Sequence, residues 1–238
     1  MSHPLDWPDR EFEVALNLGT VELTGTLGLP PQVRGVVLFA HGSGSSRHSP
    51  RNRYVARMLQ SAGFATLLID LLTAEEEAID DRTRHQLRFD IPRLARRLVG
   101  ATDWLIQCPA TRSLAIGYFG ASTGSAAALV AAVERGDRVS AIVSRGGRPD
   151  LALGVLPQVR SPTLLIVGGR DFPVLGTNED ALSQLSAPKQ LAIVPGATHL
   201  FEEPGALAEV ARLACQWFGN YLAPARSPVG GKGAIEHG

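Results

Sequence analysis

The sequence predicts an α/β fold with a mostly parallel, doubly wound sheet, an antiparallel hairpin at its N-terminal end and no cap domain. Three observations lead to this prediction. Two N-terminal segments alternate apolar with polar residues, the later apolar runs are short and continuous, and helical patterns separate those runs. The chain has 238 residues, of which 45% are hydrophobic, and this suits one domain with a sizeable core.

The expected elements follow one another along the chain. Glu11–Asn17 and Val21–Leu29 alternate in polarity and form the antiparallel pair. Strands are expected at Gly35–Ala40, Phe64–Leu72, Ser113–Phe119, Val139–Ser144 and Thr163–Val167, and Lys189–Val194 is expected to be the last strand. Helical segments are expected at Asn52–Ala62, Arg82–Gln107, Thr123–Arg135, Leu151–Leu156 (short), Asn178–Leu185 and Ala206–Leu222. Residues 1–223 then form a single domain, and residues 224–238, rich in Gly and Pro, form a flexible tail.

Composition excludes several classes of partner. Lys and Arg together number 23, as do Asp and Glu, so no net charge favours binding to nucleic acid or to an acidic membrane. The two cysteines, Cys108 and Cys215, are too few for a disulfide framework, which indicates a reducing compartment. The N-terminal segment lacks a basic start followed by an apolar stretch, so we expect no signal peptide and a cytoplasmic location.

A candidate nucleophile lies where a predicted strand meets a predicted helix. The motif Gly120-Ala121-Ser122-Thr123-Gly124 has the G-x-S-x-G pattern in the strand-turn-helix context that gives it meaning. Glycines are needed there because the serine occupies a strained turn, in which side chains at Gly120 and Gly124 would clash. The alternatives fit less well, since the glycine spacing differs from G-x-G-x-x-G and Lys232 is not followed by the Ser or Thr of a P-loop.

A serine hydroxyl needs a base to remove its proton, and histidine is the usual one. The chain has six histidines: His3, His41, His48, His85, His199 and His237. His199 follows the last predicted strand, at the carboxyl end of the sheet, where catalytic groups gather in such folds. We therefore predict that His199 is the base. His41 closes the first buried strand, a position suited to shaping the loop that follows it.

The third member of the set is a carboxylate that orients the imidazole. Asp171 follows the predicted strand Thr163–Val167 and precedes His199, which gives the order Ser, Asp, His found in α/β-hydrolases. Asp150, in the loop after the preceding strand, is the alternative.

Four motifs, His41-Gly42-Ser43-Gly44, Gly120–Gly124, Gly168-Gly169-Arg170-Asp171 and Gly196-Ala197-Thr198-His199, together resemble the dienelactone-hydrolase-like branch of the α/β-hydrolase superfamily. The resemblance implies the α/β-hydrolase fold over roughly Val14 to Leu222. It also implies an oxyanion hole formed by the backbone N–H groups of Ser43 and Thr123. Dienelactone hydrolases proper have a cysteine nucleophile, whereas this chain has Ser122, so the resemblance implies simple ester hydrolysis rather than action on dienelactone.

The predicted activity is that of a serine esterase acting on small soluble esters or lactones, with no cofactor and no metal. His199, Glu202 and Glu203 are the nearest approach to a metal set, and no H-E-x-x-H motif is present. Arg47, Arg145 and Arg148 follow strands at the predicted site and are candidates for binding an anionic group of the substrate. Thioesterase, amidase or perhydrolase activity on the same residues stays open, as does a slowly reacting sensor, and the oligomeric state is not predicted.

Overall fold

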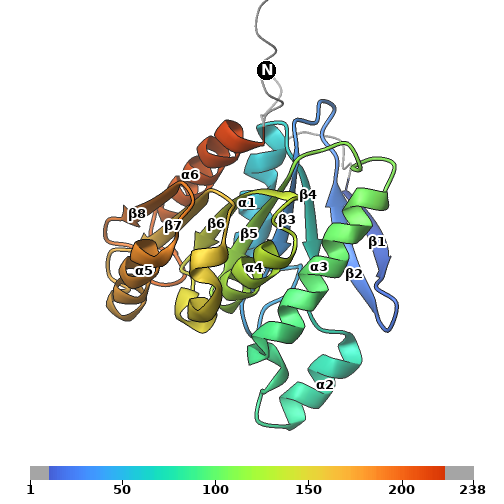
Figure 1. Cartoon of the computed structure of the whole chain (residues 1–238), viewed down its shortest axis with the longest axis horizontal. Helices are drawn as coiled ribbons and strands as arrows, with labels where there is room; N and C mark the ends of the chain where they lie inside the picture. Colours follow the sequence, from blue (N-terminus) through green and yellow to red (C-terminus); the bar gives the residue numbers. More distant parts are fainter. Residues whose placement is uncertain (1–10, 223–238) are drawn as a thin grey trace, which may run out of the picture.

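The computed structural model describes residues 11–222, which form one sheet of eight strands flanked by helices. The strands are β1 (Glu11–Asn17), β2 (Glu22–Gly28), β3 (Val36–Ala40), β4 (Ala65–Ile69), β5 (Ile116–Ala121), β6 (Val139–Arg145), β7 (Thr163–Gly168) and β8 (Lys189–Val194). Their order in the sheet is β1-β2-β4-β3-β5-β6-β7-β8. β1 and β2 are antiparallel and the strands from β3 to β8 run parallel, so the predicted architecture is confirmed (Figure 1).

Helices cover both faces of the sheet. They are α1 (Pro50–Ser61), α2 (Ala74–Arg82), α3 (Ile91–Gln107), α4 (Thr123–Glu134), α5 (Phe172–Gln184) and α6 (Ala206–Tyr221), with 3₁₀ segments η1 (Leu87–Phe89) and η2 (Pro149–Gln158). Side chains of α1 and α6 form a core with one face, and those of α3, α4, η2 and α5 form a core with the other (Figure 1). No separate cap domain is evident in this part of the chain.

The middle of the sheet follows directly from its sequence. All five residues of β3 are buried, and successive side chains enter opposite cores. Val37 and Phe39 pack toward α1 and α6, whereas Leu38 packs toward α3 and α4. A strand covered on both faces has no solvent side, which is why it is an unbroken apolar run. Because the strands from β3 to β8 run parallel, their carboxyl ends lie along one edge of the sheet.

One predicted helix was wrong. The segment expected to form a single helix over Arg82–Gln107 instead contains the end of α2, then η1, and then α3. Asp90 caps α3 by accepting a hydrogen bond from the Arg93 N–H at 3.0 Å, and Pro92 occupies the first turn. Before this cap, the buried Asp80 carboxylate binds the Leu87 N–H and the Arg88 guanidinium, which folds the connection back onto α2.

The segments that follow β7 and β6 also differ from the prediction. α5 begins at Phe172, directly after Asp171, because Pro173 is tolerated in the first turn of a helix. The short segment after β6 is 3₁₀ rather than α-helix. None of the helices within residues 11–222 is long and apolar enough to cross a membrane. The expected tail at residues 224–238 lies outside the described residues.

Candidate active site

Ser122 occupies a strained turn between β5 and α4. Its backbone has φ 50° and ψ −121°, a region that non-glycine residues rarely adopt. A Cβ atom at Gly120 would lie 2.4 Å from the Cα of Ser125, and one at Gly124 would lie 2.3 Å from the carbonyl oxygen of Ala40. The two flanking glycines of the motif are therefore sterically required, as the sequence predicted.

Hydrogen bonds from neighbouring segments stabilise this turn. The Ser122 N–H donates to the Arg145 carbonyl at 3.2 Å. The Ser122 carbonyl accepts from the Ser125 hydroxyl at 2.7 Å and from the Arg148 N–H at 3.2 Å. Because these bonds tie the turn to the end of β6, the strained backbone of Ser122 is held by the fold around it.

Asp171 and His199 meet on two adjacent loops. Oδ2 of Asp171 lies 2.6 Å from Nδ1 of His199. The loops that carry them pack backbone to backbone, since the Arg170 N–H donates to the Ala197 carbonyl at 2.9 Å. A Cβ at Gly168 would lie only 2.5 Å from that same oxygen, so glycine is needed for the close approach.

The geometry also decides how the imidazole is protonated. A carboxylate only accepts hydrogen bonds, so Nδ1 of His199 carries the proton and Nε2 is left free to accept one. Asp171 is the residue before α5 and could have capped that helix, but its side chain makes no capping bond there. The alternative acid, Asp150, instead pairs through both oxygens with Arg148.

Ser122 lies at the same edge of the sheet as the Asp171–His199 pair. A Cβ at Gly146 would lie 3.5 Å from both Nδ1 and Cε1 of His199, and Gly146 directly follows Arg145, whose carbonyl binds Ser122. Within residues 11–222, no hydrogen bond joins the Ser122 hydroxyl to the His199 ring. Catalytic hydrogen bonds often form fully only when substrate is bound.

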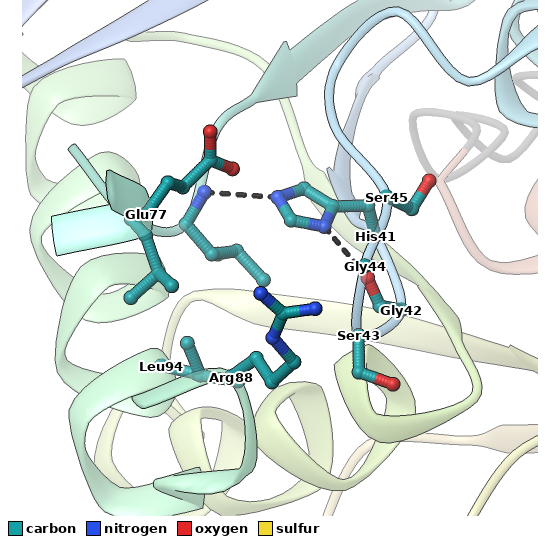
Figure 2. Close-up of a pocket in the computed structure, with 10 residues that line it drawn as sticks. His41, Gly42, Ser43, Gly44, Ser45, Glu77, Arg88 and Leu94 are labelled. Atoms are coloured by element: carbon teal, nitrogen blue, oxygen red, sulfur yellow. Dashed lines mark hydrogen bonds between the residues drawn. The ribbon is translucent and has the colours of Figure 1, made fainter. Parts of the chain in front are cut away.

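His41 shapes the loop formed by residues 41–45. Its Nδ1 lies 2.9 Å from the Gly42 carbonyl, and its Nε2 accepts the Leu71 N–H at 3.0 Å (Figure 2). A carbonyl can only accept and an N–H can only donate, so the ring is the neutral Nδ1–H tautomer. Burial lowers the pKa of His41, which favours this neutral form. His41 is thus fully engaged in positioning the loop and has no nitrogen free to act as a base.

The 41–45 loop approaches Ser122 closely. A Cβ at Gly42 would lie 3.1 Å from Cβ of Ser122, so this contact also requires glycine. The Ser43 N–H, which the family resemblance assigns to the oxyanion hole, donates to Oγ1 of Thr123 at 2.9 Å. Thr123 is the first residue of α4, and its own N–H has no acceptor within the helix. Ser43 and Thr123 are therefore neighbours beside Ser122, and they contact each other directly.

A pocket lies beside the 41–45 loop, and its opposite wall was not predicted in the sequence analysis. Figure 2 shows Arg88 and Leu94 facing that loop, with Glu77 above them. Asp80 and Asp81 bind two nitrogens of the Arg88 guanidinium, and burial together with the charge of Asp70 raises the pKa of Glu77. The signals that could have located this wall are Asp90 followed by Ile-Pro and the capping box that Thr73 forms with Glu76 at the start of α2.

The three arginines predicted to bind an anionic group differ in whether a carboxylate of the protein already pairs with them. Arg47 pairs with Asp70 and Glu13, and Arg148 pairs with Asp150, so both charges are already neutralised. These ion pairs disfavour the expected contact of Arg47 and Arg148 with substrate. Arg145 is different, because it has no salt bridge and its buried Nε and Nη1 atoms have no hydrogen-bond partner among the described residues.

Arg145 is buried close to Phe201 and to a second arginine, Arg51. Its guanidinium lies 5.8 Å from the centroid of the Phe201 ring, two residues beyond His199. Burial and the neighbouring charge of Arg51 lower the pKa of Arg145 to about 10, so the group stays charged at neutral pH.

The described residues contain no candidate metal site. No three His, Cys, Asp or Glu side chains in residues 11–222 are grouped so that they could hold a metal ion.

Comparisons with known proteins place this chain in a family. A sequence model of the dienelactone hydrolase family matches residues 23–222. The crystal structure of a dienelactone hydrolase from Anabaena variabilis is 66% identical, with a TM-score of 0.87, and the match covers 89% of this chain and 98% of that one. The dienelactone hydrolase-like promiscuous phosphotriesterase P91, from metagenomic libraries, shares the fold with a TM-score of 0.72 at 20% identity, over 90% of this chain and 98% of that one.

Two curated relatives carry a different name. Proteins from two strains of Mycobacterium tuberculosis, each named "Putative phosphoribosyl transferase", are 58% identical over 217 residues. The match covers 91% of this chain but 48% of each relative. The chain thus spans about half the length of these relatives.

Proposed function

Because this chain belongs to the dienelactone hydrolase family, we propose that it is a serine hydrolase that cleaves small carboxylic esters or lactones through an acyl-enzyme. In this proposal Ser122 is the nucleophile, His199 the general base and Asp171 the residue that orients it. The observation that carries the proposal is the 2.6 Å contact between Asp171 Oδ2 and His199 Nδ1, at the same sheet edge as the strained Ser122 turn.

The first half of the reaction forms the acyl-enzyme. Nε2 of His199 takes the hydroxyl proton of Ser122 as Oγ bonds to the ester carbonyl carbon, and the carbonyl oxygen becomes an oxyanion. The Asp171 carboxylate stabilises the imidazolium that results. His199 then gives the proton to the alcohol oxygen as the ester C–O bond breaks, which leaves the acyl group on Ser122.

The second half releases the acid. Water loses a proton to His199 Nε2 as its oxygen bonds to the acyl carbon, and the proton returns to Ser122 Oγ as the acyl-enzyme bond breaks. No step requires a metal or a cofactor, and we propose that the enzyme uses neither. Its two cysteines, Cys108 and Cys215, are both free thiols, which supports the proposal that it works in the cytoplasm.

The site favours small substrates, and we propose an anionic group on them. The pocket beside the 41–45 loop is lined in part by Leu72, Leu94 and the tethered Arg88, and we propose that it receives a short chain of the substrate. Arg145 is the predicted arginine whose charge lacks a carboxylate partner among residues 11–222. A carboxylate or similar group on the substrate would supply that partner.

The name of the mycobacterial relatives does not alter this proposal. They are about twice as long as the matched segment, and the matched segment has the hydrolase fold in this chain. We propose that a phosphoribosyl transferase activity, in those proteins, resides in the part that this chain does not match.

The main rival is a sensor that binds an ester-like ligand and turns over slowly. Both functions predict that a fluorophosphonate probe labels the protein and that mass spectrometry finds the label on Ser122. Only the hydrolase predicts sustained turnover of p-nitrophenyl acetate beyond one equivalent. Labelling without turnover would favour the sensor, and no labelling of Ser122 would overturn the proposal. Turnover of thioesters, of amides, and of an ester with hydrogen peroxide as the acyl acceptor ranks the activities that share this chemistry.

A further inference from the structure

The Thr123 side chain carries a hydrogen-bond donor in the residue directly after Ser122. Thr123 is 2% exposed, and its Oγ1 accepts the Ser43 N–H at 2.9 Å. A hydroxyl that accepts one hydrogen bond still has its own proton to donate. Within residues 11–222, that proton is not used in any other hydrogen bond of the side chain. The hydroxyl beside Ser122 therefore has an unused donor.

The fold fixes the direction of the Ser43 N–H. The Gly42 carbonyl belongs to the same peptide group and lies 2.9 Å from Nδ1 of His41, while the Ser45 N–H donates to it at 3.2 Å. In a planar trans peptide the C=O and N–H point in opposite directions, so anchoring the carbonyl aims the N–H away from His41. In this structure it is aimed at Thr123, 80 residues further along the chain.

We propose that the Thr123 hydroxyl is itself an oxyanion-hole donor, and that Ser43 acts through it. Thr123 would then give the oxyanion two hydrogen bonds, one from its backbone N–H and one from Oγ1–H. The Ser43 N–H would orient the hydroxyl and polarise it, since each bond in a donor chain strengthens the next. This inference rests on the proposed function and assigns Thr123 a catalytic role and Ser43 a positioning role.

In the alternative arrangement, the Ser43 N–H binds the oxyanion itself, and this predicts a different effect of removing the Thr123 hydroxyl. If the Ser43 N–H binds the oxyanion directly, the Thr123 hydroxyl competes for it in the resting enzyme. Removing the hydroxyl would then leave the rate unchanged or raise it. The direction in which kcat changes when the Thr123 hydroxyl is removed distinguishes the two arrangements.

The test compares Thr123→Val, which keeps the branched shape and removes the hydroxyl, with Thr123→Ser, which keeps the hydroxyl. Loss of one oxyanion-hole donor costs about 10²- to 10³-fold in kcat. We expect Thr123→Val to show a loss of this size with little change in KM, and Thr123→Ser to stay within about tenfold of the parent protein. Thr123→Ala serves as a second variant without the hydroxyl if the valine side chain prevents folding.

A second readout separates a catalytic role from a structural one. A trifluoromethyl ketone forms an anionic tetrahedral adduct with serine, so its affinity should fall in Thr123→Val by about the same factor as kcat/KM. Wild-type kcat in folded Thr123→Val or Thr123→Ala would overturn the inference. Absence of both turnover and fluorophosphonate labelling in the unmodified protein would instead overturn the proposed function, on which the inference depends.

Discussion

The carboxylate of Asp171 and the imidazole of His199 are joined at 2.6 Å although 28 residues separate them in the chain. The contact forms because the loops after β7 and β8 pack together through Gly168 and Ala197. It fixes the histidine tautomer in which Nε2 can accept a proton. Ser122 lies at the same edge of the sheet. The proposed mechanism depends on the Asp171–His199 pair because Nε2 of His199 must accept the Ser122 proton.

Asp171→Asn should lower kcat by about 10⁴-fold, because an amide that donates to Nδ1 stabilises the wrong tautomer of His199. Asp150→Asn is the matched control, since Asp150 pairs with Arg148 and makes no contact with the imidazole. Steady-state kinetics on p-nitrophenyl acetate check both variants. A larger loss in Asp150→Asn than in Asp171→Asn would move the orienting role to Asp150.

The stability of the protein should depend on pH through His41. Because burial lowers the pKa of His41, the unfolded chain binds a proton there more readily than the folded protein does. The free energy of unfolding therefore falls as pH drops below the ordinary value of 6.5, and this group adds no slope well above that value.

His41→Asn keeps a donor for the Gly42 carbonyl but cannot titrate. Thermal melting at about pH 7.5 and about pH 5.5 should show a smaller acid-induced drop in Tm for this variant than for the parent protein. The difference between the two proteins isolates His41 from the other histidines. Equal drops would show that its protonation does not contribute to acid sensitivity.

Several features of the fold and site that could be predicted from the sequence are formed by residues close together in the chain. β3 is a short apolar run, and the Ser122 turn is a motif of five consecutive residues. The Ser43–Thr123 bond was not visible, because it joins residues 80 apart and depends on how closely two loops approach. Arg47 was predicted to bind substrate because its ion pair with Asp70, which is 23 residues further along the chain, could not be seen in the sequence. Arg148 and Asp150 are two apart, so that ion pair could have been anticipated.

A substrate that carries a carboxylate should be preferred if Arg145 pairs with it. A hydrogen bond to a charged group contributes about 1.5–3 kcal/mol, which corresponds to about ten- to a hundredfold in kcat/KM. The measurement compares a short p-nitrophenyl ester that ends in a carboxylate with the same ester ending in a carboxamide.

Arg145→Met, which retains apolar contact with Phe201, should abolish this preference and affect the neutral ester less. Arg148→Met is the control, because its charge is already paired with Asp150, and it should keep the preference. The ratio of the two esters within one variant is independent of how much protein is active. Equal kcat/KM values for the two esters in the unmodified protein would contradict the role of Arg145.

The most direct test of the account is the kcat of Ser122→Ala on p-nitrophenyl acetate, beside Ser183→Ala, which changes an exposed serine on α5. Removing the nucleophile of a cooperating triad lowers kcat on the order of 10⁶-fold. We expect that loss in Ser122→Ala with an unchanged Tm, and parental activity in Ser183→Ala. If Ser122→Ala kept about a tenth of the parental kcat, Ser122 would not be the nucleophile.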